Sequence, residues 1–463
     1  MAEDLQPSSN PQRNNDPEPG LRKADSQLAS GRAGARAKFA ASVIFPALGM
    51  LILCLVVYYP LHAAGFIWDD GYWILNNPTM HHWRDLAVIW FNPMTFMQYY
   101  PLSVTAYFLQ YQLWGTDALG YHVVSILLQV ICALLLWRVL LRLRLRAAWL
   151  AAAIFAINPL VVESVAWVVE QKNLISGIWV LAAVWAWIRF TGLDRPDEVL
   201  ESAEPVYDWK FYGIAVLFYF LAVCAKTFVC ALPAAILVLT WWKLGRVTRK
   251  HLLAGIPWFV ITAGAAWMAA WRERYGAGAH GKAYHFSVFQ HLVIAGKDIW
   301  FYVRMLFWPH PILMVYPRWH VHGFTTLDIL YPITAALVAV VCFALRKRCG
   351  RGLFAAVACY AIMISPSLGI CYLCRHDHHV RGGSLFLSGL HQLNCAGDTG
   401  GSDGFGAPAI AWTNRSHAQH TAGRVRGRHR WLQKHIGRWS RSGRAAGARC
   451  GELFPMSELH SSH

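Results

Sequence analysis

Residues 41–77 read ASVIFPALGMLILCLVVYYPLHAAGFIWDDGYWILNN. The first ~20 residues of this stretch carry no charged side chain, which is long enough for a helix to cross a bilayer. The run is followed by Trp68 and two adjacent acids, Asp69 and Asp70. Carboxylates are costly to keep near hydrocarbon. The stretch therefore predicts a membrane-spanning helix with a polar site beside the membrane boundary.

The composition of the whole chain is typical of a polytopic membrane protein. Apolar residues make up 56% of the 463 residues and charged residues only 14%, whereas a soluble globular protein carries roughly 25% charged residues. The formal charge of +17 would also suit a nucleic-acid-binding protein, but the cytoplasmic loops of membrane proteins are rich in Lys and Arg. We therefore expect the lipid bilayer as a partner and no nucleic acid.

Long apolar runs recur along the chain, and we predict an all-α polytopic integral membrane protein with about nine transmembrane helices. The runs lie near residues 41–60, 119–141, 147–168, 174–190, 210–225, 228–243, 252–271, 327–345 and 352–370. With a cytoplasmic N-terminus, the basic connections 142–146, 246–250 and 346–351 all fall inside, as the positive-inside rule requires.

The same topology places a long first loop, 61–118, on the outer face. Its segments DLAVIWF and SVTAYFLQYQLW are aromatic-rich, which favours amphipathic helices lying on the membrane surface. Residues 287–308 also have a helical pattern. The charged Lys297, Asp298 and Arg304 within them favour a surface or re-entrant helix over a plain span.

Asp69, Asp70 and Glu163 are the candidate catalytic residues. A carboxylate at the membrane face can deprotonate or orient an acceptor hydroxyl while a sugar leaves a lipid phosphate. For the aspartate pair, a helix cap or an Asx turn next to Gly71 is an equal alternative. Glu163 lies in an apolar run just after Pro159, which predicts a bent helix. The alternative for Glu163 is an ion pair with Lys172 or another cation that only fixes helix packing.

Basic residues predicted on the outer face form a second group. Positive charge at the headgroup level can stabilise the leaving phosphate of a lipid-linked sugar donor. Lys226 is the most specific of these, because apolar residues flank it on both sides. Lys172 and Arg304 are the other two candidates for binding the donor phosphate, and contact with ordinary lipid headgroups is the alternative for both.

No metal site is predicted firmly. A divalent cation held by Asp69 and Asp70 is the one cofactor that the acids allow. Cys371 and Cys374, followed by several histidines, resemble half of a zinc site, but no second pair stands at a suitable spacing.

Six motifs in a fixed order resemble one known family. They are FIWDDGYWILNNP (66–78), YYPLSVTAYFLQYQLWGTDALGYHVVSILLQ (99–129), NPLVVESVAWVVEQKNLISG (158–177), AKTFVCALP (225–233), WWKLGR (241–246) and YVRMLFWPHPILMVYP (302–317). The chain thereby resembles the membrane half of the transmembrane and tetratricopeptide-repeat O-mannosyltransferases and their bacterial homologues. These enzymes look like members of the C-type superfamily of polyprenyl-phosphate-sugar-dependent glycosyltransferases.

The resemblance implies an inverting transfer of a sugar, typically mannose, from a polyprenyl-phosphate donor to a hydroxyl of a protein acceptor. The family's acids in the first outer loop match Asp69 and Asp70, and its second-loop acid matches Glu163. Its basic positions match Lys172, Lys226 and Arg304. For a bacterial protein, this places the chain in the inner (cytoplasmic) membrane, with the active face periplasmic.

The chain divides into three regions. Residues 1–38 are polar and rich in Pro and Asn, so we predict a disordered cytoplasmic segment. Residues 39–370 form the glycosyltransferase-like membrane domain. Residues 371–463 form a basic tail without apolar runs or 34-residue helical repeats, where the family continues with further spans and tetratricopeptide repeats. The abrupt onset of this tail leads us to hypothesise a shifted reading frame.

Two other functional classes remain open. An inactive, truncated remnant of such an enzyme is favoured by the aberrant tail. A transporter of lipid-linked sugars would need ionisable residues deep in the spans, whereas the acids here cluster at the predicted outer ends.

Overall fold

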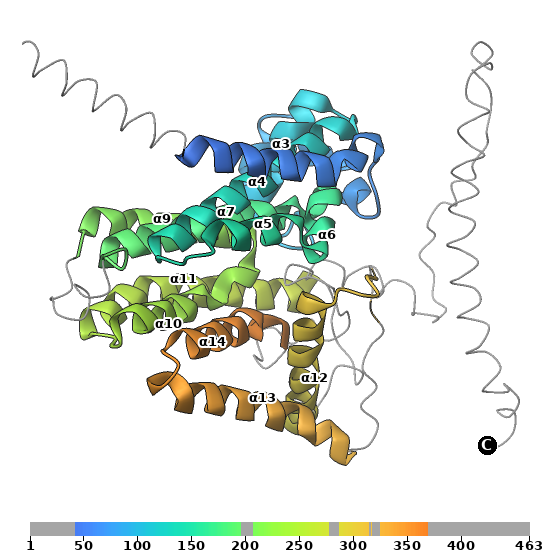
Figure 1. The fold of residues 1–463 in the computed structure, drawn as a ribbon. Coiled ribbons are helices and arrows are strands. Elements are labelled where there is room, and N and C mark those ends of the chain that lie inside the picture. The colour runs from blue at the N-terminus through green and yellow to red at the C-terminus, as the bar shows by residue number, and fades with distance from the viewer. Residues whose placement is uncertain (1–41, 196–206, 277–286, 314–315, 317–324, 369–463) are drawn as a thin grey trace, which may run out of the picture. The chain divides into compact units, whose positions relative to one another are not determined.

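The computed structural model describes residues 42–195, 207–276, 287–313, 316 and 325–368. Within these residues every regular element of more than one residue is a helix (Figure 1). This agrees with the all-α prediction. The predicted N-terminal segment 1–38, the tail 371–463 and the Cys371–Cys374 pair lie outside the described residues.

Six of the described helices are long and apolar enough to cross a membrane. They are Ser42–Ala63, which ends in η1 (Tyr59–Ala63); α4 (Ala118–Arg142); η5 (Val168–Glu170) with α7 (Gln171–Thr191); η6 (Thr227–Ala231) with α10 (Leu232–Leu244); most of α11 (Arg249–Gly276); and α13 (Thr326–Ala344) with η8 (Leu345–Lys347). The chain is thus an integral membrane protein by the length and composition of its helices.

The remaining predicted spans are also helical but shorter. A bent pair, α5 (Ala148–Ile157) with η4 (Pro159–Val161) and α6 (Val162–Ala166), would make a seventh span. Two apolar helices, α9 (Trp209–Ala225) and α14 (Gly352–Ile364) with η9 (Ser365–Leu368), fall below the length of a full span. The prediction of nine spans is therefore not confirmed, although all nine apolar runs form helices.

The predicted bend at Pro159 is confirmed. The two halves of the pair meet at 51°. Pro159 has no backbone N–H to continue the ladder of α5. Asn158 is extended, and its side-chain Oδ1 accepts a hydrogen bond of 2.9 Å from the backbone N–H of Leu160. A new helical turn, η4, therefore begins at Pro159, and the helix α6 that follows it carries Glu163.

The first loop contains four short elements. They are the π-helix η2 (Gly71–Leu75), η3 (Pro78–Met80), α2 (Asp85–Phe91) and α3 (Pro101–Trp114). α2 and α3 form where the sequence predicts amphipathic helices. Trp73 in η2 stacks on Phe96 at a centroid distance of 5.5 Å, which closes the loop on itself around an aromatic core.

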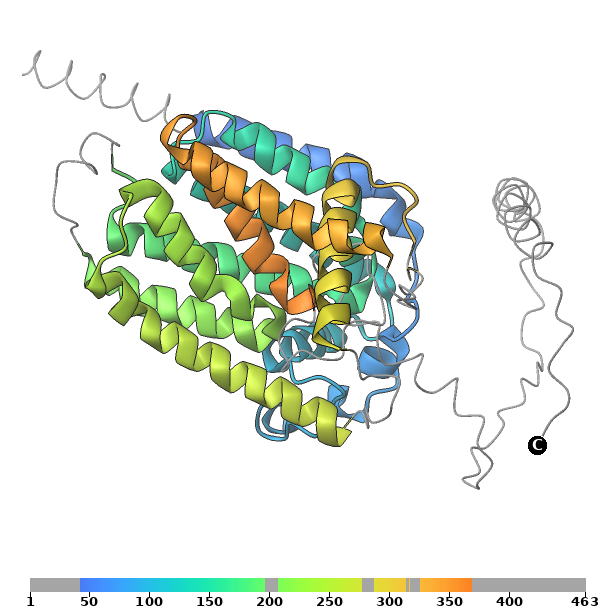
Figure 2. The same ribbon diagram turned by 90° about the horizontal axis from the view of Figure 1, so that it is seen from below.

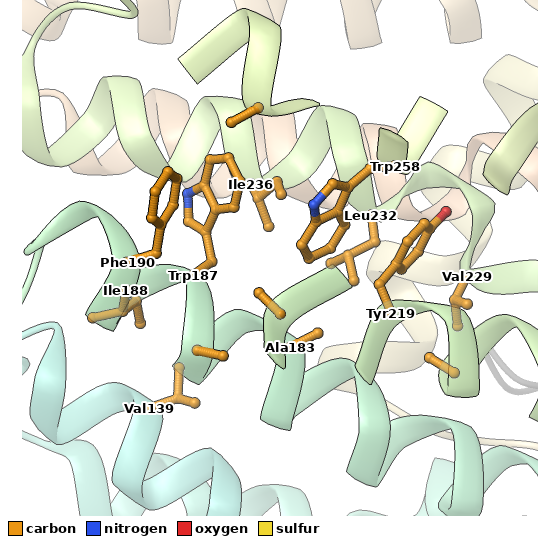
Figure 3. Close-up of a cluster of buried hydrophobic side chains, with 14 of the residues drawn as sticks. Val139, Ala183, Trp187, Ile188, Phe190, Tyr219, Val229, Leu232, Ile236 and Trp258 are labelled. Atoms are coloured by element: carbon orange, nitrogen blue, oxygen red, sulfur yellow. The ribbon is translucent and has the colours of Figure 1, made fainter. Parts of the chain in front are cut away.

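The largest apolar core lies between α7, α9, α10 and α11, as Figure 3 shows. Trp187 and Trp258 meet edge to face at 5.6 Å, and Tyr219 stacks on Trp258 at 4.6 Å. The indole N–H of Trp187 donates to the Thr240 hydroxyl over 3.0 Å, so this buried polar group is satisfied. These contacts join α7 to α9, whose ends carry the polar cluster described below.

Helix α12 (Val288–Phe307) runs across the direction of α13 and α14 in both views (Figures 1 and 2). It begins with a capping box between Ser287 and Gln290. Lys297 forms an ion pair with Asp328 at the start of α13. The charge of Lys297 on α12 is therefore paired, and the surface or re-entrant placement of α12 stays a prediction.

Gly296 sets the close approach of α12 to α13. A Cβ atom at this position would lie 2.5 Å from the backbone nitrogen of Pro332, which is a clash with backbone. We predict that Gly296→Ala lowers the stability of the full chain by about 1–3 kcal/mol, as overpacking does. Equilibrium unfolding in mixed micelles measures this.

Gly264→Ala in α11 is the matched control, because a Cβ there meets nothing within 4 Å. Alanine favours a helix over glycine by about 1 kcal/mol, so this variant should be neutral or more stable. Equal stability of the two variants would contradict the packing described for Gly296.

Candidate active site

The candidate site forms where three segments of the chain leave helical geometry. Trp68 has a positive φ of 48°, Trp167 is extended between α6 and η5, and Lys226 is extended between α9 and η6. Helix ends leave backbone groups without partners inside the helix. Side chains near these breaks can therefore form hydrogen bonds with the backbone as well as with one another.

Glu170 lies at the centre of the site, and its side chain is fully buried. The Lys172 Nζ lies 2.8 Å from its Oε1, and the Lys226 Nζ lies 3.8 Å from its Oε2. Asn173 donates to Oε2 over 2.7 Å and accepts a hydrogen bond of 2.5 Å from the Lys226 Nζ. Two buried ammonium groups thus face one buried carboxylate.

A buried polar network fixes the segment that carries Glu170. It joins α3, α4 and α7 through these hydrogen bonds: Tyr107 Oη to the Val169 carbonyl, Gln110 Nε2 to Gln171 Oε1, and Gln171 Nε2 to the Tyr121 carbonyl and the Ser125 hydroxyl. The Ser103 hydroxyl of α3 donates to the Ala225 carbonyl over 2.8 Å. Ala225 is the last residue of α9 and directly precedes Lys226. The first loop therefore orders the ends of α7 and α9.

Asp70 is a structural carboxylate in this arrangement. Its Oδ2 accepts a hydrogen bond of 2.8 Å from the Ile67 backbone N–H, and its Oδ1 accepts one of 2.9 Å from the Val169 backbone N–H. The side chain is fully buried, and this burial raises the pKa of Asp70 to about 7. It joins the first loop directly to the segment that carries Glu170. It does not cap η2 with its side chain.

Asp69 is differently placed. It is half-buried, and its Oδ1 has no hydrogen-bond partner. Burial raises the pKa of Asp69 to about 6, against the opposing pull of the Lys172 charge. A carboxylate with an uncommitted oxygen and a pKa close to neutral is suited to general-base catalysis. Of the two aspartates, the geometry therefore favours Asp69 for chemistry.

Glu163 lies in the first turn of α6 and is half-buried. Its Oε1 also has no hydrogen-bond partner. It interacts electrostatically with Glu170, Lys226 and Lys172, so it belongs to the same cluster. The alternative for Glu163, an ion pair with Lys172 or another cation, is not confirmed, because the carboxylate within ion-pair distance of Lys172 and Lys226 is that of Glu170.

The structure brings five of the six predicted site residues together: Asp69, Asp70, Glu163, Lys172 and Lys226. Arg304 lies at the end of α12, and its exposed guanidinium donates to the His310 carbonyl over 3.1 Å. Its predicted role in phosphate binding stays a prediction.

Sequence reasoning missed Glu170 and Asn173. The signal was present in the segment EQKN (170–173), which places Glu and Lys inside an apolar context. A lysine that is buried needs a carboxylate nearby. Lys172 and Lys226 are only 2% and 1% exposed. This burial, which the sequence spacing does not show, is what points to Glu170 as their shared partner.

A divalent cation does not fit the aspartate pair. Both oxygens of Asp70 accept backbone hydrogen bonds, so only Asp69 has an oxygen to offer. Among the residues that the structure describes, no group of three or more His, Cys, Asp or Glu side chains is arranged to hold a metal ion. We therefore derive no chemistry from a metal at this position.

Comparison with known proteins finds relatives with one shared description. The chain is 29% identical over 174 residues to protein O-mannosyl-transferase Tmtc3 of Drosophila melanogaster, covering 30% of this chain and 19% of that protein. It is 28% identical over 157 residues to protein O-mannosyl-transferase TMTC3 of Homo sapiens, covering 32% of this chain and 17% of the relative. It is 31% identical over 153 residues to Tmtc1 of Drosophila melanogaster, covering 30% of this chain and 18% of the relative.

The similarity supports a relationship to these proteins at the level of the family name. The match spans less than a quarter of each curated relative, from 15% to 22% of its length. No protein-family model matches the chain, and no solved structure matches it.

The buried ion cluster yields a stability prediction. Glu170→Gln leaves Lys172 and Lys226 without their carboxylate, and breaking a buried ion pair by removing one partner costs about 3–5 kcal/mol. We expect a loss of this size in equilibrium unfolding of the full chain in mixed micelles. Lys172→Met in the Glu170→Gln background should recover part of the loss.

Glu163→Gln is the control for this experiment, because the Glu163 Oε1 has no hydrogen-bond partner to lose. It should change the free energy of unfolding by about 1 kcal/mol or less. Equal destabilisation by the two substitutions would show that Glu170 is not the anchor of the cluster.

Proposed function

We propose that this protein is a membrane glycosyltransferase that transfers a sugar from a polyprenyl-phosphate donor to a protein hydroxyl. The sugar that we propose is mannose. The observation that carries the proposal is Asp69, which has a carboxylate oxygen without a hydrogen-bond partner beside the buried ion cluster of Glu170, Lys172 and Lys226. The curated relatives are named protein O-mannosyl-transferases, which supports the same reaction class.

The proposed reaction uses Asp69 as general base. Its carboxylate takes the proton of the acceptor hydroxyl as the hydroxyl oxygen attacks the anomeric carbon of the donor sugar. The bond between that carbon and the phosphate oxygen breaks, and the electron pair leaves with the polyprenyl phosphate. Attack from the face opposite the leaving group inverts the anomeric centre.

Lys172 and Lys226 act on the leaving phosphate through their charge in this proposal. Both ammonium groups contact Glu170 and are almost fully buried. In this proposal they act on the phosphate through their electric field and do not contact it. Fixed charges in a site of low dielectric stabilise developing negative charge more than they do in water. Arg304, which is exposed, is the residue that we propose for direct contact with the phosphate.

The polar cluster lies at the start of a span, because Glu170 and Lys172 stand within the first residues of Val168–Thr191. A site at a helix end is open to a lipid-linked donor from the membrane and to a protein acceptor from the aqueous side. The distribution of basic loops supports an outer-face position for this end. We propose that face as the active one, periplasmic in a bacterial inner membrane, with the N-terminus cytoplasmic.

Removal of the Asp69 carboxylate tests the proposal. We expect Asp69→Asn to lower sugar transfer by about 100-fold or more, since a general base contributes about 10²–10⁴-fold. The assay measures transfer of radiolabelled mannose from mannosyl-phosphoryl-polyprenol to Ser/Thr peptides in membranes that contain the full chain.

Asp85→Asn, in the same loop at the start of α2, is the matched control and should retain full transfer. If the unsubstituted chain transfers no sugar, the proposed activity is wrong, and the inactive remnant is then the better description. If Asp69→Asn transfers sugar normally, the assignment of the base is wrong.

The pH profile of kcat/KM gives a second test. A general base must be deprotonated, so activity is low below its pKa and rises as pH increases through it. Since burial raises the pKa values of Asp69 and Asp70 to about 6 and about 7, the rise should be centred between those two values. These neighbouring groups titrate as a pair.

Asp85→Asn should keep this rise in kcat/KM. A profile that is flat from pH 5 to 8, or one centred at the ordinary aspartate pKa of about 4, would contradict the placement of the base.

A further inference from the structure

A basic pocket lies at the opposite ends of the helices that form the candidate site. It has a volume of about 860 Å³ and is lined by residues from the ends of α4, α10 and α13 and from the start of α14: Leu143, Arg144, Leu145, Trp241, Trp242, Lys243, Gly245, Phe343, Arg346, Lys347, Gly350 and Arg351. From Tyr121 in the candidate site to Leu143 in this pocket, α4 covers about 33 Å. The two sites therefore lie at opposite ends of the helix α4, which is long enough to cross a membrane.

The charge of the pocket is one-sided. Five of its lining residues are Lys or Arg, and none is Asp or Glu. The nearby acid Asp194 is already engaged, because its carboxylate pairs with Arg142 at 2.6 Å and with Arg189 at 3.4 Å. The lining of the basic pocket thus carries positive charge and no carboxylate, which favours an anionic ligand.

The local backbone holds one of these cations in place. Gly245 ends α10 with a φ of +70°, and a Cβ atom there would lie 2.3 Å from the Nη1 of Arg351. The guanidinium of Arg351 thus lies directly against the helix end. Glycine both permits the left-handed turn and leaves room for this contact.

The helix ends themselves do not cancel this positive charge. Each helix C-terminus carries roughly −0.5 and each N-terminus roughly +0.5 of an elementary charge, so the ends of α4, α10 and α13 with the start of α14 contribute about −1 in total. Five cationic side chains outweigh this sum. Capping of helix ends therefore accounts for only part of the basic cluster.

The apolar walls of the pocket identify the kind of anion. Leu145 is 40% exposed and Phe343 is 43% exposed, so the basic groups stand beside surface that acyl chains can cover. Lys243 lies over the ring of Trp242 at 5.6 Å, and tryptophan is enriched at the headgroup level of membranes. Basic pockets between transmembrane helices bind the phosphates of anionic lipids.

We propose that the basic pocket binds the phosphate headgroup of an anionic phospholipid from the leaflet on this face. The lipid's phosphate would lie among Arg346, Lys347 and Arg351, with its acyl chains against the apolar wall. This site is separate from the donor site, and its test does not depend on sugar transfer.

Binding of cardiolipin to the purified full chain tests the proposal. Native mass spectrometry counts the bound lipid, with phosphatidylcholine as the neutral comparison. We expect selective binding of cardiolipin, weakened on the order of tenfold in the double variant Arg346→Gln and Lys347→Gln. Arg351→Gln should weaken it as well.

The control double variant is Arg249→Gln with Arg348→Gln. It removes the same charge from exposed residues of the same connections that do not line the pocket, and it should keep wild-type binding. If both double variants lose affinity equally, the effect is general surface charge and the pocket is not a site. Thermal unfolding confirms that each variant is folded.

Inorganic phosphate provides the last arm of the experiment. If millimolar phosphate alone displaces cardiolipin and stabilises the chain as strongly, the source of the anion is soluble and the lipid assignment is overturned. If cardiolipin binds with no effect of phosphate at that concentration, a lipid headgroup with its acyl chains is supported.

Discussion

The candidate site depends on the burial of one carboxylate, Glu170, between the ammonium groups of Lys172 and Lys226. Moving a single ion out of water costs several kcal/mol even after relaxation, so none of these charges would be stable alone at this depth. Their mutual contacts require the start of α7 and the end of α9 to stay together. The fold therefore fixes the position of the cluster, and the cluster in turn holds two helix ends beside the first loop.

This constraint separates acids that look alike in sequence. Asp70 uses both oxygens to bind backbone N–H groups, one of them on Val169 next to Glu170. Asp69, its neighbour, keeps one oxygen without a partner. A buried carboxylate with satisfied oxygens contributes to order, whereas one with an open oxygen can accept a proton. A hydrogen bond to a backbone group 99 residues away in the chain therefore distinguishes Asp70 from Asp69.

The sequence predicted the helices well, because a run of apolar residues has few alternatives in a membrane. It also predicted the bend at Pro159, which follows from one missing N–H. The ion pair of Glu170 with Lys172 was harder to predict. Residues two apart do not face each other on a regular helix, and this pair forms where the turn η5 ends at Glu170 and α7 begins at Gln171, one residue before Lys172. The number of spans also stayed open, since α9 and α14 are shorter than a full span.

The central claim is that Asp69 keeps one carboxylate oxygen without a partner, whereas Asp70 is held by backbone N–H groups and Glu170 by two lysines. Modification of the full chain with a water-soluble carbodiimide and an amine, followed by peptide mass mapping, tests it most directly. We predict that Asp69 is modified rapidly at pH ~6, that a polyprenyl-phosphate donor protects it, and that Asp70 and Glu170 stay unmodified. Modification of Asp70 or Glu170 at the rate of Asp69 would contradict this account of the site.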